Sequence, residues 1–264
     1  MANTDQILKS AVESALQTGK IGLHFQPIFC VAENAFTKAE ALIRLNGPDN
    51  RPLPANEVIS FAEKRGYINK LGLAVLEEAC RFFTSDGKGL RYFSVNASAK
   101  QLGEAGFAEQ VTEMLQAYGI PPQSLFIELT ESMRCQQFKQ LEANMRRLRD
   151  CGVHISLDDF GKGFADIRSL TYLPISAVKI DKCYISRAET TAATLLIRGL
   201  TGLCRRMGLS VIAEGVETSR QKRLLENLNC DYLQGYYLSR PLPPDVFAEF
   251  MKANKLSAKV AAVN

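Results

Sequence analysis

Two adjacent carboxylates, Asp158 and Asp159, end a short apolar run and are residues whose type and spacing suit chemistry. Ile155 and Leu157 alternate with polar positions, which is typical of a strand. Side chains alternate between the two faces of a strand, so these carboxylates would diverge if the strand continued. Gly161 follows and predicts a turn, which would let both carboxylates converge on one point. Such a pair favours a bound divalent cation, and a solvated Asp-Asp turn is the alternative.

The elements that position these residues follow from the alternation of short apolar runs with amphipathic stretches. This pattern predicts parallel strands joined by helices. We expect about eight strands, at Ile21–Phe29, Phe36–Leu45, Arg91–Asn96, Leu125–Leu129, His154–Asp158, Ala177–Asp181, Ser210–Glu214 and Asp231–Leu233. We expect helices at Thr4–Gln17, Ala55–Arg65, Ile68–Thr84, Phe107–Tyr118, Gln136–Asp150, Asp166–Leu173, Thr191–Met207, Ser219–Leu228 and Pro244–Ala253.

Repeated strand–helix units predict an α/β fold, a modified (β/α)8 TIM-like barrel. The link between the first two strands is too short for a helical crossover, so we expect them to pair antiparallel. The barrel would then have one antiparallel strand near the N-terminus. No linker-like shift in composition divides the chain. We therefore expect a single domain over residues 1–256 and a frayed tail over residues 257–264.

Composition and charge narrow the function classes. The net charge of +4 is mild, and the densest basic run, Arg146–Arg149, lies in a helical pattern that predicts a solvated face, so we expect no nucleic-acid duplex as partner. No apolar run approaches the roughly 18 residues of a membrane helix, and Met1–Asp5 does not begin a signal peptide. The seven cysteines include no C-x-x-C pair. We expect a cytoplasmic protein without membrane contact of its own, whose Cys80, Cys151 and Cys204 are reduced core thiols.

Polar residues stand at the carboxyl ends of strand after strand, where barrel enzymes keep their chemistry. Any one of them could be a salt-bridged barrel residue, but five carboxylates in one barrel mouth would repel strongly without cations. Oxygen ligands without His or Cys suit Mg²⁺ or Mn²⁺ rather than zinc, and there are enough for two ions. The residues are Glu40, Arg44, Asn96, Glu128, Asp158, Asp159, Lys179, Glu214 and Gln234.

Eight motifs in chain order carry a family resemblance over roughly residues 5–252. Together they resemble the EAL domains, bacterial phosphodiesterases of cyclic di-GMP. The motifs are Gln26-Pro27-Ile28, Glu40-Ala41-Leu42-Ile43-Arg44, Val95-Asn96-Ala97-Ser98, Glu128-Leu129-Thr130-Glu131-Ser132, Asp158-Asp159-Phe160-Gly161, Lys179-Ile180-Asp181, Glu214-Gly215-Val216-Glu217 and Gln234-Gly235-Tyr236.

The resemblance implies a hydrolase that opens cyclic di-GMP to linear pGpG with two divalent cations, Mg²⁺ or Mn²⁺. Lys179 would orient the attacking water, and a salt bridge to Asp158 or Asp159 is its alternative role. Gln234 would hold water or ligand by hydrogen bonds. The implied metal ligands are Glu40, Asn96, Glu128, Asp158 and Glu214, with Asp159 shared between the two ions; the implied catalytic residues are Glu40, Asp159, Lys179, Glu214 and Gln234.

The resemblance also implies a set of ligand contacts. Arg44 would grip the non-scissile side of the ligand, because its planar guanidinium suits phosphate. Gln26 and Leu42 would line the same pocket, and Asp181 and Glu217 would meet guanine edges. Glu131 would anchor the loop after the paired aspartates and link it to a dimer interface. In that loop Lys162 stands where family members usually carry a threonine.

Partners follow from the same resemblance: cyclic di-GMP, a second copy of the chain in a homodimer, and sensor or cyclase domains in a longer and in some cases membrane-anchored parent. A receptor that holds the nucleotide without cleaving it is the main alternative, and an interaction domain without nucleotide is another. His24 and His154 are expected to be structural. Tyr232, Tyr236 and Tyr237 are expected to pack the closing segment, with stacking on a base as the alternative.

Overall fold

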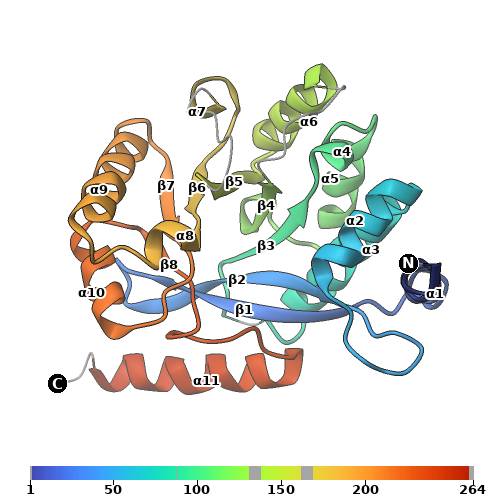
Figure 1. The fold of residues 1–264 in the computed structure, drawn as a ribbon, viewed down its shortest axis with the longest axis horizontal. Helices are drawn as coiled ribbons and strands as arrows, with labels where there is room; N and C mark the ends of the chain where they lie inside the picture. Colours follow the sequence, from blue (N-terminus) through green and yellow to red (C-terminus); the bar gives the residue numbers. More distant parts are fainter. Residues whose placement is uncertain (1, 88, 131–137, 162–168, 262–264) are drawn as a thin grey trace.

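The strands close into one barrel in the order β1-β2-β3-β4-β5-β6-β7-β8 (Figure 1). The computed structural model describes residues 2–87, 89–130, 138–161 and 169–261. Strands β2 to β8 run parallel, whereas β1 pairs antiparallel with both β2 and β8. The expected barrel with one antiparallel strand near the N-terminus is therefore confirmed. The strands are β1 (Gly22–Cys30), β2 (Ala35–Arg44), β3 (Tyr92–Ala97), β4 (Leu125–Thr130), β5 (His154–Phe160), β6 (Ala177–Ile180), β7 (Ser210–Ala213) and β8 (Tyr232–Leu233).

Helices surround the barrel and mostly match the expected ranges. The helices expected at Gln136–Asp150 and Asp166–Leu173 begin outside the described residues, and their described parts are α6 and α7. Three short segments, α4, α8 and η1, were not expected, because three or four residues are too few to show a helical period. The helical elements are α1 (Ala2–Thr18), α2 (Ala55–Arg65), α3 (Ile68–Thr84), α4 (Ala99–Leu102), α5 (Phe107–Ala117), η1 (Pro122–Ser124), α6 (Phe138–Asp150), α7 (Ser169–Tyr172), α8 (Lys182–Ile185), α9 (Thr191–Arg206), α10 (Ser219–Asn227) and α11 (Pro244–Ala261).

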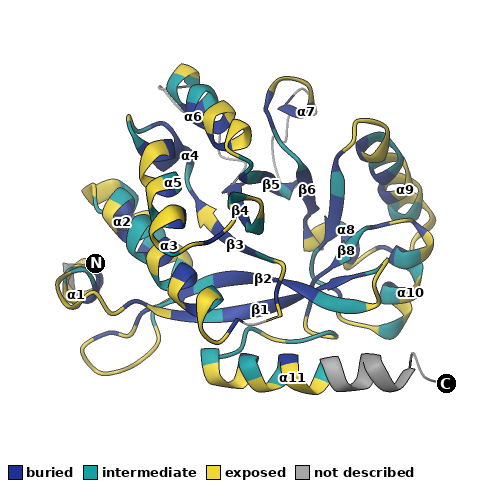
Figure 2. Ribbon diagram, turned by 180° about the vertical axis from the view of Figure 1, so that it is seen from behind, coloured by how far each residue is buried: buried dark blue, intermediate teal, exposed yellow. Residues whose placement is uncertain are grey.

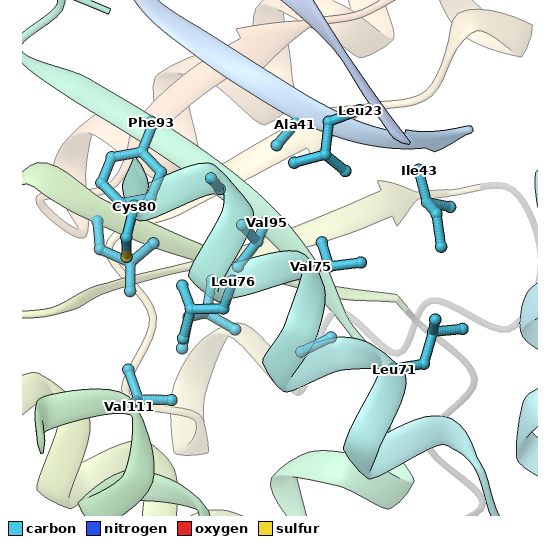
Figure 3. Packing of buried hydrophobic residues seen from close by; sticks show 14 of the residues in the cluster. Leu23, Ala41, Ile43, Leu71, Val75, Leu76, Cys80, Phe93, Val95 and Val111 are labelled. Carbon is cyan, nitrogen blue, oxygen red and sulfur yellow. The ribbon is translucent and has the colours of Figure 1, made fainter. Parts of the chain in front are cut away.

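The main core lies between the outer faces of the strands and the surrounding helices. Helix α3 contributes Leu71, Val75 and Leu76 to this core, together with Phe93 and Val95 of β3 (Figure 3). The helices accordingly bury their inner faces and expose their outer ones (Figure 2). Burying such aliphatic and aromatic side chains contributes about 1.5–3 kcal/mol each, which makes this layer the principal support of the barrel.

The barrel interior has a separate aromatic and aliphatic layer at the amino ends of the parallel strands. Phe126 of β4 stacks on His154 of β5 with ring centroids 4.5 Å apart. The Nζ of Lys38, a fully buried residue of β2, lies 3.2 Å from the centroid of the Phe126 ring. Burial lowers the pKa of Lys38 to about 7. Because His154 packs within this layer, its expected structural role is supported by its position.

Helix α11 lies along the outer side of β1 and β2 (Figure 1). Its Phe247 is fully buried and packs edge to face on Phe25 of β1. The helix runs to Ala261, whereas we expected a tail from residue 257; the segment has no glycine or proline to end a helix. In the described part of the chain, none of the helices combines the length and apolar character needed to cross a lipid bilayer.

Two surface expectations were partly wrong. Cys80 and Cys204 are buried as expected, but Cys151, which lies in the turn directly after the end of α6 at Asp150, is exposed. Tyr236 and Tyr237 are also exposed, at 55% and 47%, rather than packed in the closing segment. The basic run of α6 does form a solvated face, where Arg146 pairs with Glu142.

Candidate metal centre and ligand pocket

Lys179 lies at the centre of a ring of carboxylates contributed by four other strands or strand ends. Its Nζ is 2.5 Å from Glu128 Oε2 and 2.6 Å from Glu214 Oε1. The same atom is 3.2 Å from Asp158 Oδ1 and 3.4 Å from Glu40 Oε2. The Lys179 side chain is only 1% exposed. The salt bridge to Asp158 that we considered for Lys179 is thus present, and three further carboxylates share the same cation.

Glu40 is held by neighbours on both sides. Asn96 of β3 donates its amide N–H to Glu40 Oε1 at 2.7 Å, and Gln234, after β8, donates to Glu40 Oε2 at 2.7 Å. Gln234 also donates to Gln26 Oε1 on β1 at 3.1 Å. Four of the predicted residues from four different strands or strand ends are therefore joined in one hydrogen-bonded chain. This network ties the antiparallel β1 to the chemistry of the parallel strands.

Asp158 and Asp159 converge by a route that differs from the expected one. Strand β5 does not stop at Asp158 but continues to Phe160, and its pairing with β6 shifts register between Leu157 and Phe160. Asp159 adopts a left-handed conformation with φ of 53°, which places an extra residue in the strand as a bulge. Aspartate tolerates this conformation better than most residues. The bulge cancels the alternation of side chains, so the two carboxylates no longer diverge.

The bulge brings one oxygen atom from each of Asp158, Asp159 and Glu214 within 4.8 Å of one another. Glu128, which is fully buried, adds an oxygen atom, Oε1, that has no hydrogen-bond partner among the described residues. A buried unpaired carboxylate oxygen is costly, and a hard cation would satisfy it. The donors here are all oxygen, and they therefore fit Mg²⁺ or Mn²⁺.

The electrostatics of the ring favour uptake of positive charge. Burial, reinforced by the nearby Glu40 carboxylate, raises the pKa of Glu128 to about 7. Burial likewise raises the pKa of Glu214 to about 8, even though Lys179 opposes this shift. For Glu40, burial also disfavours the charge, but Lys179 with the hydrogen bonds from Gln234 and Asn96 outweighs it and lowers the pKa.

Lys179 remains firmly charged in the same surroundings. Burial alone would lower its pKa, but the carboxylates of Asp158, Glu128, Glu214 and Glu40 hold the pKa well above its usual value. One ammonium thus faces four carboxylates within 3.4 Å. The negative charge of the ionised carboxylates exceeds the positive charge of Lys179, which favours the binding of further cations.

An open cavity of about 210 Å³ adjoins the carboxylate ring. Gln26, Leu42 and Glu217, for which the family resemblance implies ligand contacts, all line it. Sequence reasoning missed other lining residues, because neither a lysine in an unexpected short helix nor a glycine carries a chemical signal by itself. The full lining is Gln26, Glu40, Leu42, Lys182, Glu214, Gly215, Glu217, Gln234, Gly235 and Tyr236.

Tyr236, expected to pack the closing segment, instead borders this cavity with its ring exposed. The guanidinium of Arg240 lies 4.2 Å from the centroid of that ring. The alternative considered for this tyrosine, stacking on a base, is compatible with such an exposed ring beside the pocket.

Two residues that were predicted to contact the ligand, Arg44 and Asp181, have hydrogen-bond partners within the protein. Arg44, at the end of β2, donates from Nη1 to the carbonyl oxygen of Ile43 at 2.8 Å. Asp181, which is 2% exposed, accepts a hydrogen bond from the backbone N–H of Cys183 at 2.8 Å and caps α8. The contact of either residue with a nucleotide stays a prediction. The predicted loop anchor Glu131 and the altered position Lys162 lie outside the described residues.

The strands form a closed barrel, and a ring of carboxylates around Lys179 lies at their carboxyl ends beside an open cavity. These features place the chain in the class of TIM-like barrel proteins with a candidate cation site. Within that class, the chain belongs to the EAL domain family, whose model matches residues 9–241. The resemblance read from the motifs is thereby confirmed.

Individual relatives support the same assignment. The chain is 37% identical over 253 residues to the signaling protein YkoW of Bacillus subtilis, covering 94% of this chain and 31% of that protein. It is 32% identical over 255 residues to the cyclic di-GMP phosphodiesterase NbdA of Pseudomonas aeruginosa, covering 95% and 33%. It spans about a third of the length of these curated relatives. The solved structure of the PaMucR phosphodiesterase in complex with c-di-GMP superposes with a TM-score of 0.81 at 33% identity, covering 91% of this chain and 99% of that one.

Proposed function

We propose that this domain hydrolyses cyclic di-GMP to linear pGpG with two divalent cations, Mg²⁺ or Mn²⁺. The observation that carries the proposal is the carboxylate ring itself: four carboxylates within 3.4 Å of Lys179 Nζ, beside a cavity lined by Glu40 and Glu214. Membership of the EAL family and a relative named as a cyclic di-GMP phosphodiesterase support the choice of substrate.

The ligand set proposed for the cations is the one that the family resemblance implies. Glu40, Asn96, Glu128, Asp158 and Glu214 would hold the ions, and Asp159 would serve both. When bound, the cations supply the charge that lowers the pKa of water and stabilises a transferring phosphoryl group. The structural features that support this assignment are the bulge at Asp159 and the Oε1 atom of Glu128, which has no hydrogen-bond partner in the described part of the chain.

The side chains around the proposed cation site would orient the water and the ligand. Lys179, fixed by its carboxylates, would hold the attacking water by a hydrogen bond and offset charge on the phosphate oxygens. Gln234, whose amide N–H already donates to Glu40 and Gln26, would keep the ligand carboxylate in one orientation. Leu42 and Gln26 give the pocket one apolar and one polar wall.

The cavity is smaller than the ~300–1,000 Å³ typical of pockets for drug-sized ligands. A cyclic dinucleotide would therefore fill it with one part and lie across the open barrel rim with the remainder. Tyr236 and Glu217, both exposed at the border of the cavity, are placed to meet that remainder. Arg44 and Asp181 are the further contacts that the family resemblance suggests.

For the assembly, we propose a homodimer within a longer signalling protein. Leu195 and Leu196 of α9 are 60% and 43% exposed, and adjacent exposed leucines mark a surface that a second copy could cover. The curated relatives are about three times as long as this chain. Sensor or cyclase domains would account for the additional length. Light scattering on the purified domain measures directly whether it forms a homodimer.

Turnover is tested by incubating the purified protein with cyclic di-GMP and either Mg²⁺ or Mn²⁺, with a parallel sample in excess chelator. We expect metal-dependent appearance of pGpG on chromatography. The variant Glu40→Ala should abolish turnover, whereas Glu142→Ala, which removes an exposed carboxylate of α6, should not. Unchanged turnover in Glu40→Ala would refute the metal assignment. Retention of intact nucleotide by the protein would instead identify a receptor.

A further inference from the structure

Tyr184 of the short helix α8 contacts the chain just after the paired aspartates. Its hydroxyl donates a hydrogen bond to the carbonyl oxygen of Gly161 at 2.8 Å. Its ring occupies the space beside Gly161, since a Cβ at that glycine would lie 2.3 Å from Tyr184 Cε2. Gly161 has φ of +94°, a conformation that side chains other than hydrogen disfavour. The Tyr184 ring therefore packs in the space that a side chain at residue 161 would need, and the turn depends on both the ring and the glycine.

That turn is the continuation of the bulge that brings the carboxylates together. Asp159 adopts φ of 53°, and its backbone N–H donates to Asp158 Oδ1 at 2.8 Å. The left-handed conformation is unfavourable for a residue other than glycine, and it persists only when the surrounding contacts fix it. The hydrogen bond from Tyr184 fixes the chain two residues beyond Asp159, at Gly161.

The same helix packs against the strand end that carries the third carboxylate. A Cβ placed on Gly215, the residue after Glu214, would lie 2.4 Å from Cβ of Lys182. Helix α8 follows β6, which lies between β5 and β7 in the barrel. It is therefore in contact with the chain after Asp158 and Asp159 on one side and with the chain after Glu214 on the other.

Both ends of α8 are themselves fixed. At its start, Asp181 accepts the hydrogen bond from Cys183 N–H. At its end, Gln221 of α10 donates from Nε2 to the carbonyl oxygen of Ile185 at 3.2 Å. The Oε1 of Gln221 accepts at 2.8 Å from the backbone N–H of Glu217, a residue lining the cavity. The helix is thus a rigid spacer between two parts of the candidate site.

We infer that Tyr184 is a positioning residue, which through its hydrogen bond to Gly161 sets the spacing of the Asp158 and Asp159 carboxylates relative to Glu214. The inference rests on the proposed function, because it takes these carboxylates to be cation ligands. Tyr184 itself would touch neither cation nor nucleotide. It acts on metal affinity through the geometry of the turn, since ligand oxygens must be held within tenths of an ångström to bind a divalent ion well.

The test is Tyr184→Phe, which removes the hydroxyl and keeps the ring against Gly161. Mn²⁺ alone is titrated into the protein, and free Mn²⁺ is followed by electron paramagnetic resonance. Losing one hydrogen bond of ordinary strength predicts roughly 2- to 10-fold weaker Mn²⁺ binding. The matched control is Tyr118→Phe, which removes a hydroxyl bonded to Glu77 at 3.2 Å on α3, away from the carboxylates. It should bind Mn²⁺ as the wild type does.

A second measurement separates positioning from a general loss of stability. At saturating Mn²⁺ the KM of Tyr184→Phe for cyclic di-GMP should equal that of the wild type, while the Mn²⁺ concentration for half-maximal rate rises with the dissociation constant. Equal Mn²⁺ affinity in wild type and Tyr184→Phe would overturn the inference and leave the proposed function intact. A comparable loss in Tyr118→Phe would also overturn it. Failure of the wild type to bind Mn²⁺ would refute the proposed function, and the inference with it.

Discussion

Replacing Lys179 by methionine should destabilise the metal-free protein, and the loss should grow as the pH rises. The substitution keeps the length of the side chain but removes an ammonium that, among the described residues, contacts four buried or partly buried carboxylates. Leaving buried charges without their partner costs about 3–5 kcal/mol when the remaining groups stay ionised. We therefore expect a loss of about 4 kcal/mol at a pH near 8.5, where the carboxylates of the wild type are charged.

The pH dependence follows from the two raised pKa values. Glu128 and Glu214 have pKa values of about 7 and about 8 with Lys179 present, and removing the ammonium raises both further. At a pH near 6 both of these carboxyls are protonated in either protein, so less charge is left unpaired than near pH 8.5, although Glu40, whose pKa Lys179 lowers, loses its partner at either pH. Between there and pH 8.5 the folded variant retains protons that the wild type releases. Stability falls with pH where the folded state binds more protons than the unfolded state, and here that amounts to about 3 kcal/mol.

Urea unfolding in excess chelator at the two pH values measures both quantities. The expected losses are about 4 kcal/mol near pH 8.5 and about 1 kcal/mol near pH 6. Lys9→Met is the matched control, because Lys9 pairs with Glu13 at 3.9 Å on the exposed face of α1. Its loss should be below about 0.5 kcal/mol at either pH. A loss for Lys179→Met that is equal at both pH values, or larger at the lower one, would refute the electrostatic account of the ring.

Two further outcomes follow from the same structure. Saturating Mg²⁺ should raise the free energy of unfolding more near pH 8.5 than near pH 6, because Glu128 and Glu214 must lose protons to bind a cation; equal increments in urea unfolding would contradict this. Gly235→Ala should lower the free energy of unfolding by about 1–3 kcal/mol, because its Cβ would lie 2.2 Å from the backbone N and O atoms of Val216. It should also reduce turnover, because the displaced chain would break the hydrogen bond from Gln234 to Glu40. Wild-type stability and turnover in that variant would show that the two loops can separate freely.

Much of the barrel and of the candidate site could be predicted because each signal is local and repeated. Strand after strand shows an apolar run with a polar residue at its carboxyl end, and parallel strands bring those ends to one rim. The side chains of Glu40, Glu128 and Glu214 therefore had to be neighbours once the barrel was recognised. The structure adds that Lys179 lies among them; the salt-bridge alternative had named only Asp158 or Asp159 as its partner, and the bridge to Asp158 is present.

The features that sequence reasoning missed depend on contacts between distant segments. The left-handed Asp159 reads as an ordinary strand end, since a bulge leaves no period in the sequence. Helix α8 has four residues, and its role comes from Gly161 and Gly215, which are far from it along the chain. The exposure of Tyr236 likewise depends on where the closing segment crosses the rim. Each requires the tertiary fold before its meaning is visible.

The repulsion that first suggested cations has a measurable counterpart in the folded protein. Four carboxylates around one ammonium are not all ionised in the neutral range without further positive charge, and the raised pKa values of Glu128 and Glu214 express that deficit. Protons supply the missing charge when divalent cations are absent, and cations would displace them when present. Cation binding at this ring must therefore release protons, and the number released should decrease as the pH rises through about 7 and 8. A solvated Asp-Asp turn would show no such coupling, because its carboxyls would already be ionised.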